Sequence, residues 1–148
     1  FVNKLITNTP DVKFDVYGLN NIQPIWADHY FKTISNSKMG LNLSRGEPIK
    51  YYSSDRITQI IGNGLVTLID EKTQYKDFFN EKEMVFYKNL SDLSEKILKI
   101  TRDDKLRRSI AKNGKDKYLK YFNSTLVADY IINKSLNSPI KKKFFWEK

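Results

Sequence analysis

The alternation of short apolar segments with longer amphipathic ones predicts an α/β fold, with a Rossmann-like, mostly parallel sheet and helices on both of its faces. The clearest strand is residues 65–69, a continuous apolar run after Asn63-Gly64, typical of a strand buried on both faces of a parallel sheet. The clearest helix is residues 90–100, whose apolar side chains recur on one helical face. Beyond it the pattern is only helical, so we expect the C-terminal helices to pack over the sheet.

Local patterns predict the other elements. Strand patterns occur in residues 12–17, 22–26, 39–43 and 84–87. Helical patterns occur in residues 1–8, 28–36, 54–62 and 75–79, and two more helices begin near Asp103 and Asn123. The order of these elements alternates strand and helix up to residue 100, as in other α/β domains.

Length and composition indicate one folded domain. The 148 residues are 40% hydrophobic and 29% charged, which is ordinary for a globular protein. No run of about 18 apolar residues is present, so no segment is expected to span a membrane. The absence of cysteine excludes disulfides and thiolate metal sites and fits a cytoplasmic location. We assign residues 1–136 to the domain and residues 137–148 to a basic, aromatic tail.

The positive charge is concentrated toward the C-terminus. The net charge is +9, and residues 96–148 hold 15 Lys and Arg against 5 Asp and Glu. Such a surface attracts anionic partners in general, although a solvated lysine-rich face is the alternative. Nucleic acid is not expected as a partner, because the segment lacks glycine and aromatic RNA-binding motifs. Residues 141–148 combine lysines with Phe and Trp, which predicts either peripheral contact with an anionic membrane surface or a disordered terminus.

A polar, basic loop follows the strand at 39–43 and precedes a short helix. In open α/β sheets, ligands bind beyond the carboxyl ends of the strands. Arg45, Lys50 and Arg56 supply positive charge there, while Ser53, Ser54 and the backbone amides at the helix start supply donors. These residues predict a site for an anion such as a diphosphate. The alternative is an ordinary loop whose Ser and Asp residues cap the helix.

Several weak motifs in a fixed order carry a resemblance to a known family. They are Leu41-Asn42-Leu43-Ser44-Arg45, Arg56, Gly64 before an apolar strand, the segment 92–97, and Ala111-Lys112-Asn113-Gly114. Over residues 1 to about 132 the chain resembles the C-terminal half of GT-B glycosyltransferases. It looks most like the family related to the spore-maturation protein CgeB, the glycosyl transferases group 1. This resemblance implies a domain that binds a nucleotide diphosphate sugar, with the acceptor held by a separate N-terminal domain across a cleft.

The resemblance also implies roles for particular residues. Arg56 matches the arginine of an R-x-x-E segment near the donor diphosphate, whereas Gln59 replaces its glutamate and Tyr51 replaces the acidic residue eight positions earlier. Gln still accepts one hydrogen bond from a ribose hydroxyl, but the paired glutamates of retaining enzymes are absent. Apart from the resemblance, Tyr51, Tyr52 and Tyr87 are candidates to stack on a base or sugar, although aromatic residues at strand and loop ends are more often packing residues. The candidate donor-binding residues are Asn42, Arg45, Lys50, Tyr52, Ser53, Ser54, Arg56 and Gln59.

Two functions follow as expectations. The first is a metal-independent glycosyltransferase donor domain without a cofactor, inactive alone, whose catalytic base lies in the N-terminal domain. The alternative is a non-catalytic, degenerate GT-B module that mediates protein or anionic-membrane contact. The family fold further implies a first strand between residues 12–17 and 39–43; because the sequence starts inside the helix that follows it, we expect that strand upstream.

Overall fold

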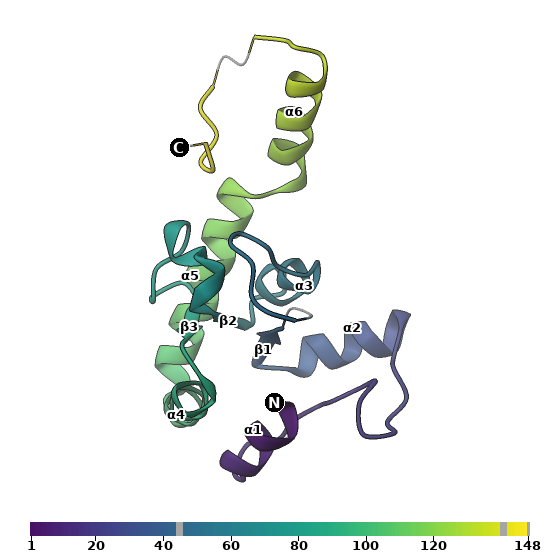
Figure 1. The fold of residues 1–148 in the computed structure, drawn as a ribbon, viewed down its shortest axis with the longest axis vertical. Helices are drawn as coiled ribbons and strands as arrows, with labels where there is room; N and C mark the ends of the chain where they lie inside the picture. The colour runs from purple at the N-terminus through teal and green to yellow at the C-terminus, as the bar shows by residue number, and fades with distance from the viewer. Residues whose placement is uncertain (44–45, 140–141, 148) are drawn as a thin grey trace.

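The protein is an α/β domain built on a three-stranded parallel sheet (Figure 1). The computed structural model describes residues 1–43, 46–139 and 142–147. The strands are β1 (Met39–Asn42), β2 (Val66–Asp70) and β3 (Val85–Tyr87), in the order β1-β2-β3. The α-helices are α1 (Val2–Asn8), α2 (Ala27–Asn36), α3 (Arg56–Gly62), α4 (Leu90–Arg102), α5 (Asp104–Tyr121) and α6 (Ser124–Ser135), and two 3-10 turns, η1 (Glu71–Thr73) and η2 (Tyr75–Asp77), follow β2. The predicted fold class is therefore confirmed.

Helices cover both faces of the sheet because successive strand residues point to opposite sides. Val66 and Leu68 of β2 face a cluster that includes residues of α1 and α4, whereas Ile69 faces a cluster that includes residues of α3. α5 contributes buried residues to the first cluster and half-buried aromatic rings to the second. As predicted, β2 is buried on both faces, which fixes its place at the centre of the sheet.

Side-chain caps define where the C-terminal helices begin. Asn89 accepts a hydrogen bond from the Asp92 amide at 3.0 Å at the start of α4. Asp103 and Asn123 make the equivalent bonds at the starts of α5 and α6, at 2.8 and 3.0 Å. The predicted helix starts at Asp103 and Asn123 are confirmed, since each residue satisfies an amide that has no partner within its helix.

Two predicted strands are not strands in the structure. Residues 12–16 are extended and alternate between half-buried and exposed, but they belong to no sheet, and residues 22–26 form none either. Within the described residues, β1 pairs only with β2, so its other edge has no strand beside it. Both segments have the side-chain pattern of a strand. They are not strands, because no neighbouring strand supplies the ladder of hydrogen bonds that a sheet requires.

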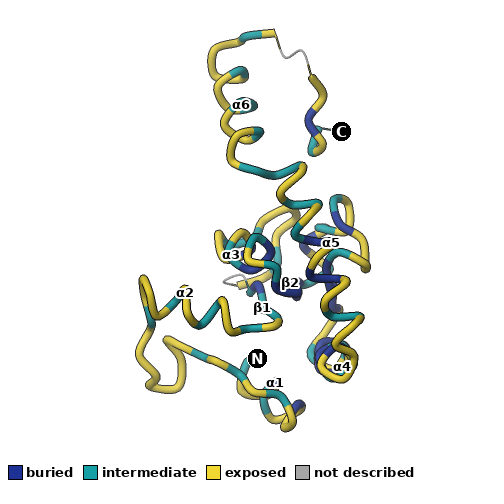
Figure 2. Tube along the Cα trace, turned by 180° about the vertical axis from the view of Figure 1, so that it is seen from behind, coloured by how far each residue is buried: buried dark blue, intermediate teal, exposed yellow. Residues whose placement is uncertain are grey.

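The α6 helix and the tail form a separate packing arrangement at one end of the molecule. α5 contacts β2 as expected, but α6 has no buried residue and projects beyond the end of α5 (Figures 1 and 2). Residues 142–147 fold back onto the two helices: Phe144 is buried, and the Trp146 ring lies 5.7 Å from Tyr130 and 5.8 Å from Phe122. The described part of the tail is therefore docked through its aromatic rings, an arrangement that neither sequence alternative anticipated.

Candidate functional site

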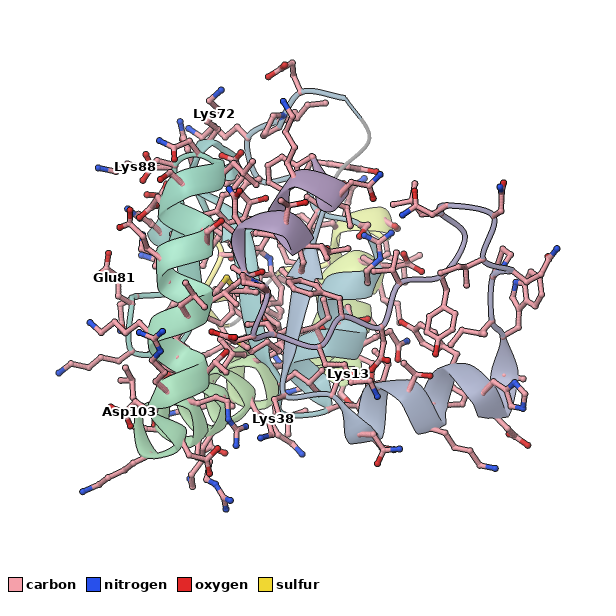
Figure 3. The ribbon with its side chains drawn as sticks, turned by 90° about the horizontal axis from the view of Figure 1, so that it is seen from below. Lys13, Lys38, Lys72, Glu81, Lys88 and Asp103 are labelled. Atoms are coloured by element: carbon pink, nitrogen blue, oxygen red, sulfur yellow. The ribbon has the colours of Figure 1, made fainter. Side chains whose placement is uncertain are left out.

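The candidate site lies at the edge of the sheet where all three strands end. Because the strands are parallel, Asn42, Asp70 and Tyr87 terminate at the same edge. The β1–α3 loop, residues 43–55, leaves this edge and returns to the sheet through α3; its residues 44 and 45 lie outside the described ranges. Figure 3 views the sheet and its helices from below, with the side chains of Lys72 and Lys88 pointing away from the body.

Asn42, the last residue of β1, is buried and is hydrogen-bonded to the β1–α3 loop. Its side chain is 3% exposed, and its Oδ1 accepts a hydrogen bond from Ser54 Oγ at 2.9 Å. Its Nδ2 is buried and has no hydrogen-bond partner in the described structure. A buried donor without a partner is destabilising by about 1–3 kcal/mol, so a ligand or water that accepts from this amide would remove that cost.

Arg56 lies at the first position of α3, beside the end of β1. Its Nη1 donates to the Leu43 carbonyl at 3.1 Å, which draws the guanidinium over the strand end, and the side chain is otherwise exposed. A guanidinium has five N–H donors, so one bond to a carbonyl leaves capacity for an anion. The geometry therefore places a cation at the Leu43 carbonyl, one residue beyond Asn42.

The backbone amides of α3 contribute less than the sequence predicts. The amides of Ile57 and Thr58 donate to the carbonyls of Ser54 and Asp55 at 3.0 Å each, so they are not free for a ligand. Asp55 occupies the cap position without a side-chain hydrogen bond to the helix. The donors considered at this site are therefore the side chains, not these two amides.

Residues after β2, which sequence reasoning missed, hold the loop in place. The Tyr75 hydroxyl donates to Ser53 Oγ at 3.0 Å, the Tyr51 amide donates to the Thr73 carbonyl at 2.8 Å, and the Tyr51 hydroxyl donates to Asp77. In the sequence the 75–79 segment showed only a helical turn, a signal that says nothing about a contact with residues 22 to 26 positions earlier.

The other predicted residues are placed less closely. Lys50 is exposed, with its Nζ 4.8 Å from the centre of the Tyr51 ring, and the Tyr52 side chain is 51% exposed. Gln59 is half-buried and lies one turn beyond Arg56 on α3. Arg45 falls outside the described residues. Thus the structure gathers Asn42, Ser53, Ser54 and Arg56 around the strand end, and it leaves Lys50 and Tyr52 on the surface of the same loop.

The other ionisable groups at this edge, Tyr87 and Asp70, do not form a second cluster of charges. Burial, with a smaller contribution from nearby Asp70, raises the pKa of Tyr87 to about 12, so its phenol stays protonated at neutral pH. Asp70 accepts a hydrogen bond from the Lys72 amide at 2.9 Å. No group of three or more His, Asp or Glu side chains in the described residues is arranged to hold a metal ion, and no helix there is long and apolar enough to cross a membrane.

A hollow in the described structure lies elsewhere, between β3, α4 and α5. It has a volume of about 170 Å³ and is lined mainly by apolar side chains of β3, α4 and α5, with Glu81, Lys96 and Lys99 among its other lining residues. Lys96 Nζ donates to the Phe86 carbonyl at 2.7 Å and to Asp92 at 2.9 Å. No residue of the β1–α3 loop lines this hollow, so it is not part of the candidate site.

Comparison with known proteins identifies the family. Neither the curated proteins nor the solved structures contain a match to the chain. The family model described as glycosyl transferase-like matches residues 1–133, which is nine-tenths of the sequence. Together with the parallel sheet and the loop at its carboxyl edge, this match shows that the chain belongs to the glycosyl transferase-like family.

Proposed function

We propose that this domain holds a nucleotide diphosphate sugar for transfer to an acceptor bound by a separate N-terminal domain, with the donor diphosphate on the β1–α3 loop. The observations that carry this proposal are both at the carboxyl end of β1: the buried Nδ2 of Asn42 has no partner in the described structure, and the exposed Arg56 is held to the next residue by its bond to the Leu43 carbonyl. Membership of the glycosyl transferase-like family supports it, because glycosyl transfer in such families uses a nucleotide-sugar donor. The closer relationship to the CgeB-related proteins stays a prediction.

The chemistry proposed for these residues is stabilisation of the leaving group. When the anomeric carbon is displaced, negative charge develops on the departing nucleoside diphosphate. Arg56 and Lys50, together with Arg45, would stabilise that charge without a metal ion, and the Asn42 amide and the Ser53 and Ser54 hydroxyls would orient the phosphate oxygens. The base that deprotonates the acceptor is assigned to the N-terminal domain, so the 148 residues alone are proposed to bind the donor without turning it over.

Gln59 defines how the ribose would be bound. A Gln side chain accepts through Oε1 and donates through Nε2, so it can hold one ribose hydroxyl but lacks the charge of a glutamate. Tyr52, whose ring is half exposed on the loop, is proposed to stack on the base or the sugar. Neither residue determines whether the anomeric configuration is retained or inverted.

Calorimetric titration of UDP and GDP into the full chain tests the proposal. We expect Arg56→Ala to weaken binding by about 1.5–3 kcal/mol, the range for a charge-assisted hydrogen bond. Arg102→Ala is the matched control, because Arg102 is exposed at the far end of α4 and its loss changes the net charge equally. Equal affinities of the two variants, or no binding of any nucleotide to the wild type, would show that the donor site is not here.

A second candidate function is a non-catalytic module that contacts a protein or an anionic membrane. One observation favours protein contact: α6 exposes the apolar side chains Val127, Ile131 and Ile132 and buries none, and Leu136 just after its end is exposed too. For membrane contact, Lys143 and Phe145 remain exposed on the docked tail. Vesicles with about one-third anionic lipid should then sediment more of the full chain than of a chain without residues 138–148. Equal amounts of the two chains in the pellet would show that the tail does not bind the membrane. Nucleotide binding separates this candidate from the donor domain.

A further inference from the structure

Hydrogen bonds at Ser53 and Ser54 hold the β1–α3 loop on two sides. On one side, Ser54 Oγ donates to Asn42 Oδ1 at 2.9 Å, within the end of β1. On the other side, the Tyr75 hydroxyl donates to Ser53 Oγ at 3.0 Å and lies 3.4 Å from the Tyr51 carbonyl. The adjacent serine hydroxyls are therefore held by two different segments, one before the loop and one after β2.

Tyr51 shows that the loop conformation is imposed by these contacts. Its φ is +60°, in the left-handed region, which is unfavourable for a bulky side chain. Three contacts hold it there: its amide donates to the Thr73 carbonyl at 2.8 Å, its hydroxyl donates to Asp77, and its ring lies 5.0 Å from Phe78. A strained backbone of this kind persists only where the surroundings determine it, and such residues concentrate at functional sites.

We propose that Tyr75 is a positioning residue for the donor site, which acts through Ser53 and the Tyr51 backbone and does not touch the ligand. Tyr75 lies in η2, and its ring packs against Phe78 at 6.1 Å between centroids, so both the turn and this contact hold the hydroxyl in position. By fixing the loop before the donor arrives, Tyr75 reduces the ordering that binding requires, which raises affinity without a new contact to the ligand.

The test is Tyr75→Phe, which keeps the ring and removes only the hydroxyl. The full chain is titrated with UDP, and amide exchange is measured at Tyr51, whose own hydrogen bond to Thr73 reports the loop conformation. We expect UDP to bind about threefold to tenfold more weakly, as for the loss of one hydrogen bond, and the Tyr51 amide to exchange faster without ligand. The matched control is Tyr121→Phe, because the Tyr121 ring stacks on Phe145 at 4.6 Å, in the docked tail.

A double-mutant cycle with Ser53→Ala separates positioning from a general loss of stability. If Tyr75 acts through Ser53, Tyr75→Phe should weaken UDP binding less in the Ser53→Ala background than in the wild type. The proposal is overturned if the Tyr51 amide exchanges at the wild-type rate in Tyr75→Phe. It is also overturned if Tyr75→Phe weakens UDP binding equally in the wild-type and Ser53→Ala backgrounds.

The effect on affinity rests on the proposed function, whereas the effect on exchange does not. If the wild type binds no nucleoside diphosphate, the donor assignment fails. Faster exchange at Tyr51 in Tyr75→Phe would still establish that Tyr75 holds the loop, and unchanged exchange would overturn that as well.

Discussion

Replacing Gly114 by alanine should destabilise the domain, although glycine in the middle of a helix is usually unfavourable. Gly114 lies in α5 where the helix crosses the turn before β3. A Cβ at this position would lie 2.3 Å from the Glu83 carbonyl oxygen and 3.6 Å from the Ile61 side chain. The carbonyl cannot move away easily, because the turn is closed by hydrogen bonds from the Glu83 and Met84 amides to Asn80 at 3.0 Å each.

The magnitude follows from two opposing effects. Glycine to alanine in a helix interior stabilises by about 1 kcal/mol through backbone entropy. Forcing a methyl group into filled space costs about 1–3 kcal/mol, and here the group meets backbone rather than a flexible side chain. The displacement would also stretch the ion pair of Lys117 with Glu83, which is 2.8 Å long and mostly shielded from solvent. Because the methyl group meets backbone, the clash falls in the upper part of that range, about 2–3 kcal/mol, which leaves a net loss of about 1–2 kcal/mol.

Urea denaturation of the full chain measures this loss. With a slope of about 2 kcal/mol per M, the midpoint of Gly114→Ala should fall by about 0.5–1 M. Gly62→Ala is the control: Gly62 is the last residue of α3, and no atom lies within 4 Å of its Cβ position. That variant should be unchanged or more stable by up to about 1 kcal/mol. A midpoint for Gly114→Ala at or above that of the wild type would refute the close contact between α5 and the turn.

Two further predictions concern a helix–strand contact and the docked tail. A Cβ on Gly40 would lie 2.6–2.8 Å from three atoms of Ile60. Gly40→Ala should therefore lower the free energy of unfolding by about 1–3 kcal/mol in the wild type and by much less in an Ile60→Ala background. Equal losses in the two backgrounds, measured by urea denaturation, would contradict the contact. In the docked tail, Lys142 Nζ lies 2.5 Å from Asp129 Oδ2, and this hydrogen-bonded ion pair lowers the pKa of Asp129 below its usual value. The carboxylate therefore stabilises docking above about pH 4, and this contribution is lost as pH falls further. Trp146 emission, measured in a Trp26→Phe background, should therefore shift to the red on acidification, and an Asp129→Asn variant that keeps the wild-type emission and pH profile would show that the ion pair does not hold the tail.

The parts of the fold that the sequence predicted correctly are those fixed by local chemistry or by burial on both sides. β2 was recognisable because residues 65–69 are apolar at every position except Thr67, without alternation, and it does lie between β1 and β3. The starts of α5 and α6 were recognisable because Asp103 and Asn123 cap them with their own side chains. The docking of the tail was not recognisable, since lysines next to aromatic residues suit a membrane surface, a solvated terminus and an aromatic cluster equally well.

The candidate site divides in the same way. The sequence predicted where the loop and Arg56 lie, because a basic segment after a strand has a known place at the carboxyl edge of a parallel sheet; that they bind a ligand there stays a prediction. It did not predict Tyr75, because its bond to Ser53 joins two irregular segments whose distance depends on how β2 and α3 pack. The prediction that the amides at the start of α3 are free was wrong for Ile57 and Thr58. Both amides donate to carbonyls within the first turn of the helix.

Residues 12–16 show why a strand pattern is not sufficient for a strand. Their alternation was predicted correctly, since Val12, Phe14 and Val16 are half-buried while Lys13 and Asp15 are exposed. Alternation, however, determines only which side chains face the core, whereas a strand also requires a neighbour with free backbone groups. In the described structure neither residues 13–17 nor the outer edge of β1 has such a neighbour, and the two are not paired with each other. A strand between them stays a prediction; except at the buried Asn42, it would pair backbone groups of residues that are half-buried or exposed here, where water can otherwise satisfy them.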